Sequence, residues 1–197
     1  MEEVGMPSTY RPDERLLETA YELFCVRGVR DVGVDELVER AGVAKATLYR
    51  HFASKDELIL AFLKLREERW TIGWLEASVR ARGGTPEERL LTVFDLFDEW
   101  FQEPGYAGCP FIKVLVEMGP GHPAGAASIE HLNTIRELLT ELATDAGFSD
   151  PAGLGLSLHL LLCGSIIQAS LGYVTAAERA RHMTQAVMQE FRQPRQS

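Results

Sequence analysis

The residues with the clearest chemical potential lie between Arg40 and Lys55. This stretch contains the cations Arg40, Lys45, Arg50 and Lys55 and neither Asp nor Glu. Guanidinium and ammonium groups bind phosphate oxygens and the acceptor edges of bases. The whole chain carries a net charge of -9, but salt screens exposed charges beyond roughly 8–10 Å, so the local patch decides what can bind. We therefore expect this stretch to contact nucleic acid.

Two short helices joined by a tight turn are expected to carry these cations. The first helix is indicated by apolar residues that recur on one face: Val34, Leu37, Val38 and Ala41. Gly42 follows, and glycine tolerates the left-handed conformation that ends many helices. Residues 45–51 predict a second helix of about two turns, buried along Leu48 and Phe52. This arrangement over residues 33–52 is typical of a helix-turn-helix that reads the major groove of DNA.

The face of the second helix opposite Leu48 is expected to be exposed and suited to DNA. It would present the side chains of Ala46, Thr47, Tyr49 and Arg50, with Lys45 at the helix start. Lys55 lies in the first turn of the following helix, where free backbone N–H groups also favour a phosphate. The competing interpretation is a helical hairpin in a bundle whose basic edge is merely solvated.

The flanking segments favour the DNA-binding interpretation. A preceding amphipathic helix has Pro12 suited to its first turn and Gly28 to its end, and it can cover the next two helices. After them, Ser54 and Glu57 form a capping box that opens a long helix. One face of that helix carries Leu58, Ala61, Phe62, Leu65 and Ile72.

Residues 11–69 resemble the N-terminal domain of the TetR family of bacterial transcriptional regulators. The resemblance rests on the motif AGVAKATLYRHF at residues 41–52, followed by Ser54 and Lys55. It implies a homodimer that binds double-stranded DNA at a palindromic operator, usually a repressor that a small molecule releases. The positions at which the family contacts DNA correspond to Lys45, Thr47, Tyr49, Arg50, His51 and Lys55.

Two positions depart from the family pattern. Family members often have Ser or Thr where this chain has Gly33, and Ser where it has Ala44. Replacing a side-chain cap costs about 1 kcal/mol for alanine and less for glycine. Both residues still offer a backbone N–H, so we expect weaker phosphate anchoring rather than loss of DNA binding.

The rest of the chain also reads as helices. Thr85, Pro86 and Glu88 form a capping box with a first-turn proline, and Asp150 precedes another helix start at Pro151. No segment alternates with period two, so we predict an all-α chain of about nine helices. The expected organisation is a disordered arm at 1–10, a three-helix DNA-binding domain at 11–53, a ligand-binding and dimerisation domain at 54–191, and a disordered tail at 192–197.

The segment from Pro151 to Ala177 contains no Asp, Glu, Lys or Arg. Its length would suffice to span a bilayer, which needs about 20 apolar residues. Interrupting glycines and polar side chains favour burial against a partner subunit instead, so we expect no membrane insertion. With the amphipathic helix at 175–191, the helix at 151–172 is predicted to form a homodimer interface of four helices.

Large aromatic side chains suggest a mostly apolar pocket for a small-molecule effector. Ordinary core packing explains any one of them equally well. The candidate pocket residues are Trp70, Trp74, Phe94, Phe97, Trp100, Phe101, Phe111 and Met118, with Glu117, His122, His159 and Gln168 as polar anchors. DNA and effector are expected to favour different separations of the two DNA-binding domains of the dimer. The helix that follows Ser54 would couple the effector pocket to these domains.

Other function classes find little support in the sequence. It contains no nucleophile elbow, glycine-rich phosphate loop or HExxH motif, so we do not expect an enzyme. No cluster has metal-ligand spacing, and no metal or cofactor is expected. The chain start resembles no signal peptide, and Cys25, Cys109 and Cys163 lack CxxC spacing, which fits a reducing cytoplasm.

Three alternatives remain beside the repressor hypothesis. The first is an architectural DNA-binding protein that responds to no ligand. The second is a ligand-binding bundle that has lost DNA recognition. The third is a redox-sensing regulator in which Cys109, at a helix start, is the reactive thiol.

Overall fold

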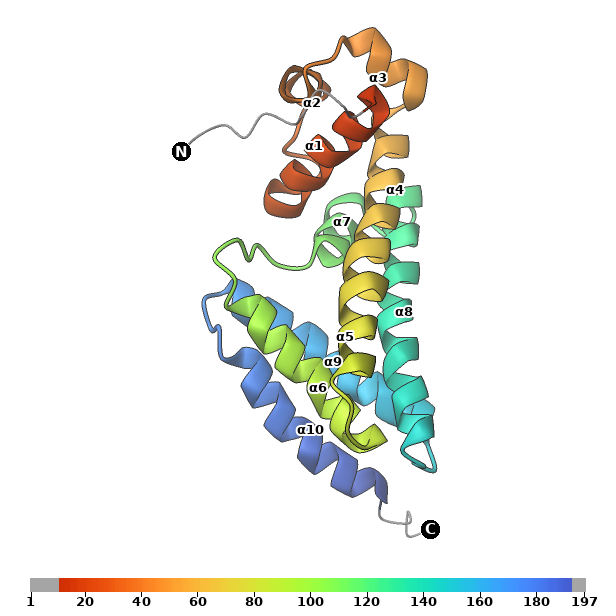
Figure 1. Ribbon diagram of the computed structural model, residues 1–197, viewed down its shortest axis with the longest axis vertical. Helices are drawn as coiled ribbons and strands as arrows, with labels where there is room; N and C mark the ends of the chain where they lie inside the picture. Colours follow the sequence, from red (N-terminus) through yellow and green to blue (C-terminus); the bar gives the residue numbers. More distant parts are fainter. Residues whose placement is uncertain (1–10, 193–197) are drawn as a thin grey trace. The chain divides into compact units, whose positions relative to one another are not determined.

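The computed structural model describes residues 11–192, and every regular element within them is helical (Figure 1). Three consecutive elements form one continuous run, so this part of the chain has nine helical segments. The predicted all-α fold is confirmed. The disorder expected at 1–10 and at 193–197 lies outside the described residues, whereas Arg192 is the last residue of a helix.

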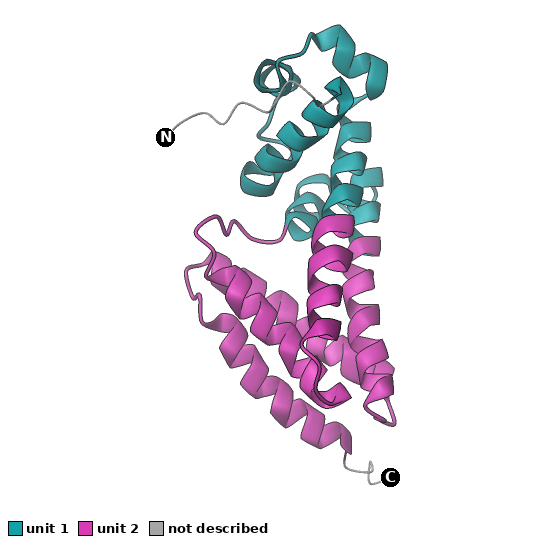
Figure 2. Ribbon diagram, in the orientation of Figure 1, with its two compact units in different colours: residues 1–66, 110–129 teal, residues 67–109, 130–197 magenta. Residues whose placement is uncertain are grey.

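The chain divides into two compact units (Figure 2). Of the described residues, unit 1 comprises 11–66 and 110–129, and unit 2 comprises 67–109 and 130–192. The predicted domains are contiguous segments that meet after residue 53. The compact units are instead discontinuous, because 110–129 packs with the N-terminal residues.

The first three helices of unit 1 have the bounds expected from their sequence signals. They are α1 (Pro12–Arg27), α2 (Val34–Ala41) and α3 (Lys45–His51). Gly42 ends α2 in the left-handed conformation, with φ of 63°, which a residue without a Cβ adopts most readily. Leu37 and Leu48 are fully buried and anchor the inner faces of α2 and α3. The helix-turn-helix geometry thus follows from local signals.

The long helix after the motif contains a π-helix that the sequence did not predict. Its consecutive elements are α4 (Lys55–Arg66), η1 (Glu67–Glu76) and α5 (Ala77–Ala81). The expected apolar stripe is wrong at Ile72, which is 49% exposed, while Thr71 and Leu75 are buried. A π-helix closes its hydrogen bonds one residue later than an α-helix, so the inward face shifts along the sequence.

Unit 2 is built from η1, α5 and three further helices, together with most of α8. These are α6 (Pro86–Phe101), α8 (Pro123–Asp145), α9 (Pro151–Ser170) and α10 (Ala176–Arg192). The capping box of α6 is present, since Glu88 Oε2 accepts from Thr85 N at 2.6 Å and Thr85 Oγ1 accepts from Glu88 N at 3.2 Å. Asp150 caps α9 by accepting from Gly153 N at 2.9 Å. Phe94 and Phe97 are fully buried in the core of this unit.

Candidate nucleic-acid interface

Helix α3 presents its polar and basic side chains on the face opposite its buried anchor. Leu48 is 0% exposed and fixes the helix against α1 and α2. Thr47 is half-buried at the margin of the outer face. The exposed residues of α3 are Lys45, Ala46, Tyr49, Arg50 and His51. The side chains that the sequence predicted to be available are therefore accessible, and they come from a rigid two-turn element.

Helices α2 and α3 both begin without a side-chain cap. Their N-cap residues Gly33 and Ala44 are extended, with ψ of 157° and 147°, and neither forms a side-chain cap hydrogen bond. The first backbone N–H groups of each helix therefore lack the partner that Ser or Thr would supply. The predicted reduction in phosphate anchoring depends on this feature.

Two of the predicted DNA-contacting side chains bind nearby groups in unit 1. Lys45 Nζ lies 2.7 Å from Asp35 Oδ1 on α2, and this hydrogen bond raises the pKa of Lys45 above its ordinary value. Arg50 donates from Nη2 to Thr47 Oγ1 at 3.2 Å. Both cations stay exposed, so a phosphate could replace these partners at the cost of a surface contact worth about 0–1 kcal/mol.

Lys55 differs from the cations of α3 because its ammonium group points into unit 1. Its Nζ donates to the carbonyl oxygen of Val29 at 2.5 Å and lies 6.0 Å from the centre of the Phe24 ring. Burial lowers the pKa of Lys55. The structure thus gives this side chain an internal partner, whereas the sequence predicted that it would contact a phosphate.

The predicted effector residues divide between the two units. In unit 2, Trp70 lies 5.2 Å from Trp74, 5.3 Å from Phe97 and 4.7 Å from Trp100, measured between ring centres. Phe101 and Tyr106 extend this cluster, with ring centres 5.1 Å apart. Tyr106, which follows the helix-ending Pro104-Gly105 pair, is not among the predicted effector residues. Its hydroxyl also donates to the carbonyl oxygen of Ile166 at 3.0 Å.

Buried and half-buried polar groups lie close in sequence to Trp70 or pair with the start of η1. Glu67 accepts from Thr134 Oγ1 at 2.9 Å and pairs with His131 Nδ1 at 2.8 Å. Thr71, four residues after Glu67 in η1, is 2% exposed, and its Oγ1 has no hydrogen-bond partner among the described residues. A buried hydroxyl without a partner is costly, and a polar group of a ligand could satisfy it.

The remaining candidates do not converge on the aromatic cluster. Phe111, Met118 and His122 belong to unit 1, where His122 Nδ1 accepts from Ala124 N at 3.2 Å. His159 in α9 lies 3.5 Å from Cys163 Sγ, and burial lowers the pKa of this imidazole. Gln168 is exposed and lines a groove between α9 and α10. His122 therefore has a structural role at the start of α8.

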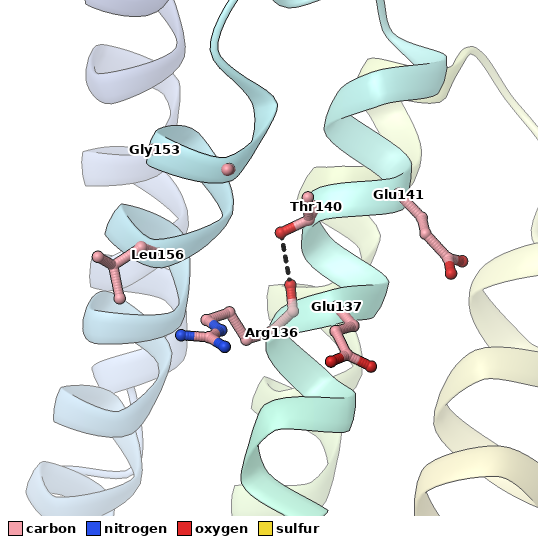
Figure 3. A pocket seen from close by; sticks show the side chains of 7 residues that line it. Arg136, Glu137, Thr140, Glu141, Gly153 and Leu156 are labelled. Carbon is pink, nitrogen blue, oxygen red and sulfur yellow. Dashed lines mark hydrogen bonds between the residues drawn. The ribbon is translucent and has the colours of Figure 1, made fainter. Parts of the chain in front are cut away.

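An open groove between α8 and α9 contains none of the predicted effector residues (Figure 3). Its volume is about 690 Å³, and Arg136, Glu137 and Glu141 contribute charged groups to its lining. Thr140 Oγ1 donates to the carbonyl oxygen of Arg136 at 2.9 Å, so this hydroxyl is already satisfied (Figure 3).

The described residues provide no obvious metal or redox centre. Within residues 11–192 no three His, Cys, Asp or Glu side chains are grouped to hold a metal ion. Within the same residues, Cys25, Cys109 and Cys163 form no disulfide. Cys109 is only 7% exposed, and burial raises the pKa of the Cys163 thiol to about 11. Both properties oppose fast reaction with an oxidant.

Known proteins resemble this chain over the helix-turn-helix and over the whole fold. The sequence profile described as "Bacterial regulatory proteins, tetR family" matches residues 16–62. The crystal structure of a putative TetR transcriptional regulator (sav143) from Streptomyces avermitilis has 30% identity and a TM-score of 0.79, covering 92% of this chain and 98% of that one.

Two curated relatives match mainly the N-terminal part. The HTH-type transcriptional activator FasR of Mycolicibacterium smegmatis is 53% identical over 55 residues, which are 26% of this chain and 25% of FasR. The HTH-type transcriptional repressor KstR2 of Mycobacterium tuberculosis is 37% identical over 82 residues, covering 40% of this chain and 38% of KstR2. The matches thus span well under half of either relative. These relatives are transcriptional regulators, in agreement with the expectation that the chain is not an enzyme.

Proposed function

Since this chain belongs to the TetR family of bacterial transcriptional regulators, we propose that it is a sequence-specific DNA-binding repressor that a small, largely apolar effector releases from its operator. The observation that carries this proposal is the outer face of α3. There Lys45, Tyr49 and Arg50 are exposed on a short helix whose opposite side is fixed by Leu48. A protein that binds chromosomal DNA in this way would act in the cytoplasm.

DNA binding would place α3 in the major groove. Arg50 can donate two hydrogen bonds to guanine or bind a phosphate, and Lys45 can exchange Asp35 for a phosphate. Tyr49, which is 47% exposed, and the flanking Ala46 and Thr47 supply hydroxyl and methyl contacts. Because the acidic remainder of the chain repels DNA, binding would depend on this short basic face.

A second copy of the chain is the proposed partner for the outer faces of α9 and α10. Large apolar side chains are exposed there: Leu156, Leu160, Ile167, Leu171, Tyr173 and Met183. Several of them line the groove of about 500 Å³ between the two helices. By length and composition α9 would also suffice to cross a membrane. We instead assign its exposed apolar side chains to contact with the second copy. A two-fold dimer would cover this face and present two α3 helices about 34 Å apart, one turn of DNA.

The aromatic cluster of unit 2 is the proposed effector site. Trp70, Trp74 and Trp100 offer apolar walls, and the unpartnered Thr71 hydroxyl offers one polar anchor. If effector and DNA favour different conformations with a coupling of about 1–3 kcal/mol, operator affinity changes by about 5–150-fold. FasR, described as an activator, makes effector-dependent activation the second candidate.

Selection from a random pool of duplex oligonucleotides tests the DNA-binding proposal. The purified full chain should enrich a palindromic sequence. If each subunit makes about four phosphate contacts, the slope of log affinity against log salt should be about -7 for the dimer. A pool that shows no enrichment, or a slope near zero, would contradict the assigned interface.

Arg50→Ala separates phosphate contact from base reading. Loss of a phosphate contact should reduce the magnitude of the salt slope by about 0.9 per subunit, whereas loss of a base contact should relax specificity at one position. Arg80→Ala is the matched control, because it removes an exposed arginine from α5 in unit 2. Equal effects of the two substitutions would mean that only net charge matters.

Leu160→Glu tests the proposed dimer. This side chain is 66% exposed, so a charge there should be tolerated by the monomer and expelled from an apolar interface. Analytical ultracentrifugation should show monomers, and DNA affinity should fall with them. Ile129→Glu, at an exposed apolar position of α8 in unit 1, should leave the dimer intact.

A further inference from the structure

Helix α7 (Pro110–Met118), which is distant in sequence, lies beside α1 in unit 1 (Figure 1). A lysine of α7 holds the end of α1. Lys113 Nζ donates to the carbonyl oxygen of Cys25 at 3.0 Å and to that of Val26 at 2.9 Å. The last carbonyl groups of an α-helix have no partner within the helix, and a cation near them is favourable. Lys113 therefore satisfies the end of α1 from outside the N-terminal segment.

The turn that follows α1 is held by a glutamate of α7. Glu117 Oε2 accepts from Val29 N at 2.8 Å and from Arg30 N at 3.0 Å. Such carboxylate bonds are about twice as strong as neutral ones. Lys113 and Glu117 are four residues apart on α7, so both side chains project from one face. We call this pair the α7 clamp.

The turn is shaped to receive the Glu117 carboxylate. Gly28 is buried with φ of 85°, and a Cβ on it would lie 2.0 Å from Glu117 Oε1. No other residue type fits there without displacing the carboxylate. The carbonyl oxygen of Val29 is meanwhile held by Lys55 of α4. In the turn between α1 and α2, a side chain of α7 thus binds backbone N–H groups and a side chain of α4 binds a backbone carbonyl group.

The α7 clamp connects the proposed DNA-binding helices to a later part of the chain. Helix α7 follows α6 of unit 2 through residues 102–109, yet it packs within unit 1. Helix α1 contacts α2, α3 and α4, so the junction between α1 and α2 influences how the recognition helix is held. A displacement of α7 would therefore act on α3 through backbone atoms, without any change to a side chain that contacts DNA.

We propose that Lys113 and Glu117 are positioning residues for DNA binding, which hold the α1–α2 junction in the conformation that presents α3 to the operator. This inference rests on the proposed function. It identifies α7 as the segment through which the later part of the chain controls the α3 surface. The clamp itself contacts no DNA.

The test compares full-length variants on the duplex that the wild-type protein enriches most from a random pool. The variants are Glu117→Ala, Glu117→Gln and Lys113→Met, with Glu88→Gln as the matched control. Glu88 makes the same kind of carboxylate–backbone bond in unit 2. Affinity and its salt slope are measured at a temperature where circular dichroism shows every variant to be folded, and amide hydrogen exchange is followed at Val29 and Arg30.

Glu117→Ala and Lys113→Met should each weaken binding by about tenfold, within the 5–150-fold range of coupled sites. Glu117→Gln, which keeps an acceptor oxygen, should recover part of the loss. The salt slope should stay at the wild-type value, because no phosphate contact is removed. The amides of Val29 and Arg30 should exchange faster in Glu117→Ala, and Glu88→Gln should lower thermal stability without changing affinity.

Wild-type affinity in folded Glu117→Ala would overturn the inference and leave the proposed function intact. An equal loss of affinity in Glu88→Gln would also overturn it, because the effect would then reflect general stability. Failure of the wild-type protein to enrich any duplex would overturn the proposed function, and the inference with it.

Discussion

The ammonium nitrogen of Lys55 lies 2.5 Å from the carbonyl oxygen of Val29, so the cation that opens α4 is bound inside unit 1. Lysine at the start of a helix would otherwise be well placed for a phosphate. The Lys55 side chain is half-buried, and this partial burial lowers the pKa of its ammonium group. Its contribution to the molecule is therefore expected to be structural.

Lys55→Met should lower stability more than it alters DNA binding. Methionine keeps the apolar stem but leaves the buried Val29 carbonyl without its donor, at a cost of about 1–3 kcal/mol. Urea unfolding should report this loss, while the salt slope of DNA binding stays unchanged. Lys64→Met, at an exposed position of α4, is the control for net charge. A slope reduced by about 0.9 per subunit would instead restore Lys55 as a phosphate contact.

Asp35→Asn should strengthen DNA binding. Asp35 holds Lys45 at 2.7 Å and adds a negative charge beside the proposed interface. A surface pair of this kind is worth about 0–1 kcal/mol, so affinity should rise by up to about fivefold at low salt. Glu190→Gln, on an exposed face of α10, changes net charge equally and should leave affinity unchanged. Weaker binding by Asp35→Asn would mean that Asp35 orients Lys45 productively.

Gly73→Ala should destabilise the protein, although alanine is normally the better helix former. A Cβ on Gly73 would lie 2.8 Å from the carbonyl oxygen of Glu68, which the π-helix brings close. The steric cost, about 1–3 kcal/mol for overpacking, should exceed the usual gain of about 1 kcal/mol. Urea unfolding measures whether Gly73→Ala lowers or raises the free energy of unfolding. Ala77→Gly in the adjacent α5 calibrates ordinary helix propensity, and stabilisation by Gly73→Ala would rule out the π-helical winding.

Cys163 should react slowly with thiol reagents at neutral pH. Burial raises the pKa of its thiol from 9.0 to about 11, so at pH 8 the thiolate fraction falls by about 100-fold. Labelling at this site should increase tenfold per pH unit up to about pH 10. Mass spectrometry of peptides, with urea-unfolded protein as reference, measures the rate. Labelling at the unfolded rate at pH 8 would contradict the raised pKa of the Cys163 thiol.

Local signals predicted the DNA-reading helices well. The bounds of α2 and α3 follow from the spacing of Leu37 and Leu48, and from Gly42, whose left-handed conformation separates the two helices. Each of these signals acts over four or five residues. The accessibility of Arg50 then follows from helical geometry, because the buried edge fixes the outer face.

Features that depend on distant residues were not predictable. The contact between Val29 and Glu117 joins positions 88 residues apart, and nothing in the spacing of either segment indicates it. Gly28 was predicted as a helix end, whereas its second role, leaving room for a carboxylate, became visible only with α7 in place. Likewise, Ile72 fits an α-helical stripe, and only the hydrogen-bond pattern of η1 shows that it faces outward.

The discontinuity of unit 1 bears on the engineering of hybrid regulators. Chimeras that join the first 66 residues to another sensor would leave the amides of Val29 and Arg30 without the Glu117 carboxylate. If the new ligand-binding domain has no acidic side chain at the corresponding position, these two amides lose their hydrogen-bond acceptor next to the DNA-binding helices. Transplanting residues 110–118 together with the first 66 residues should preserve operator recognition that a simple fusion would lose.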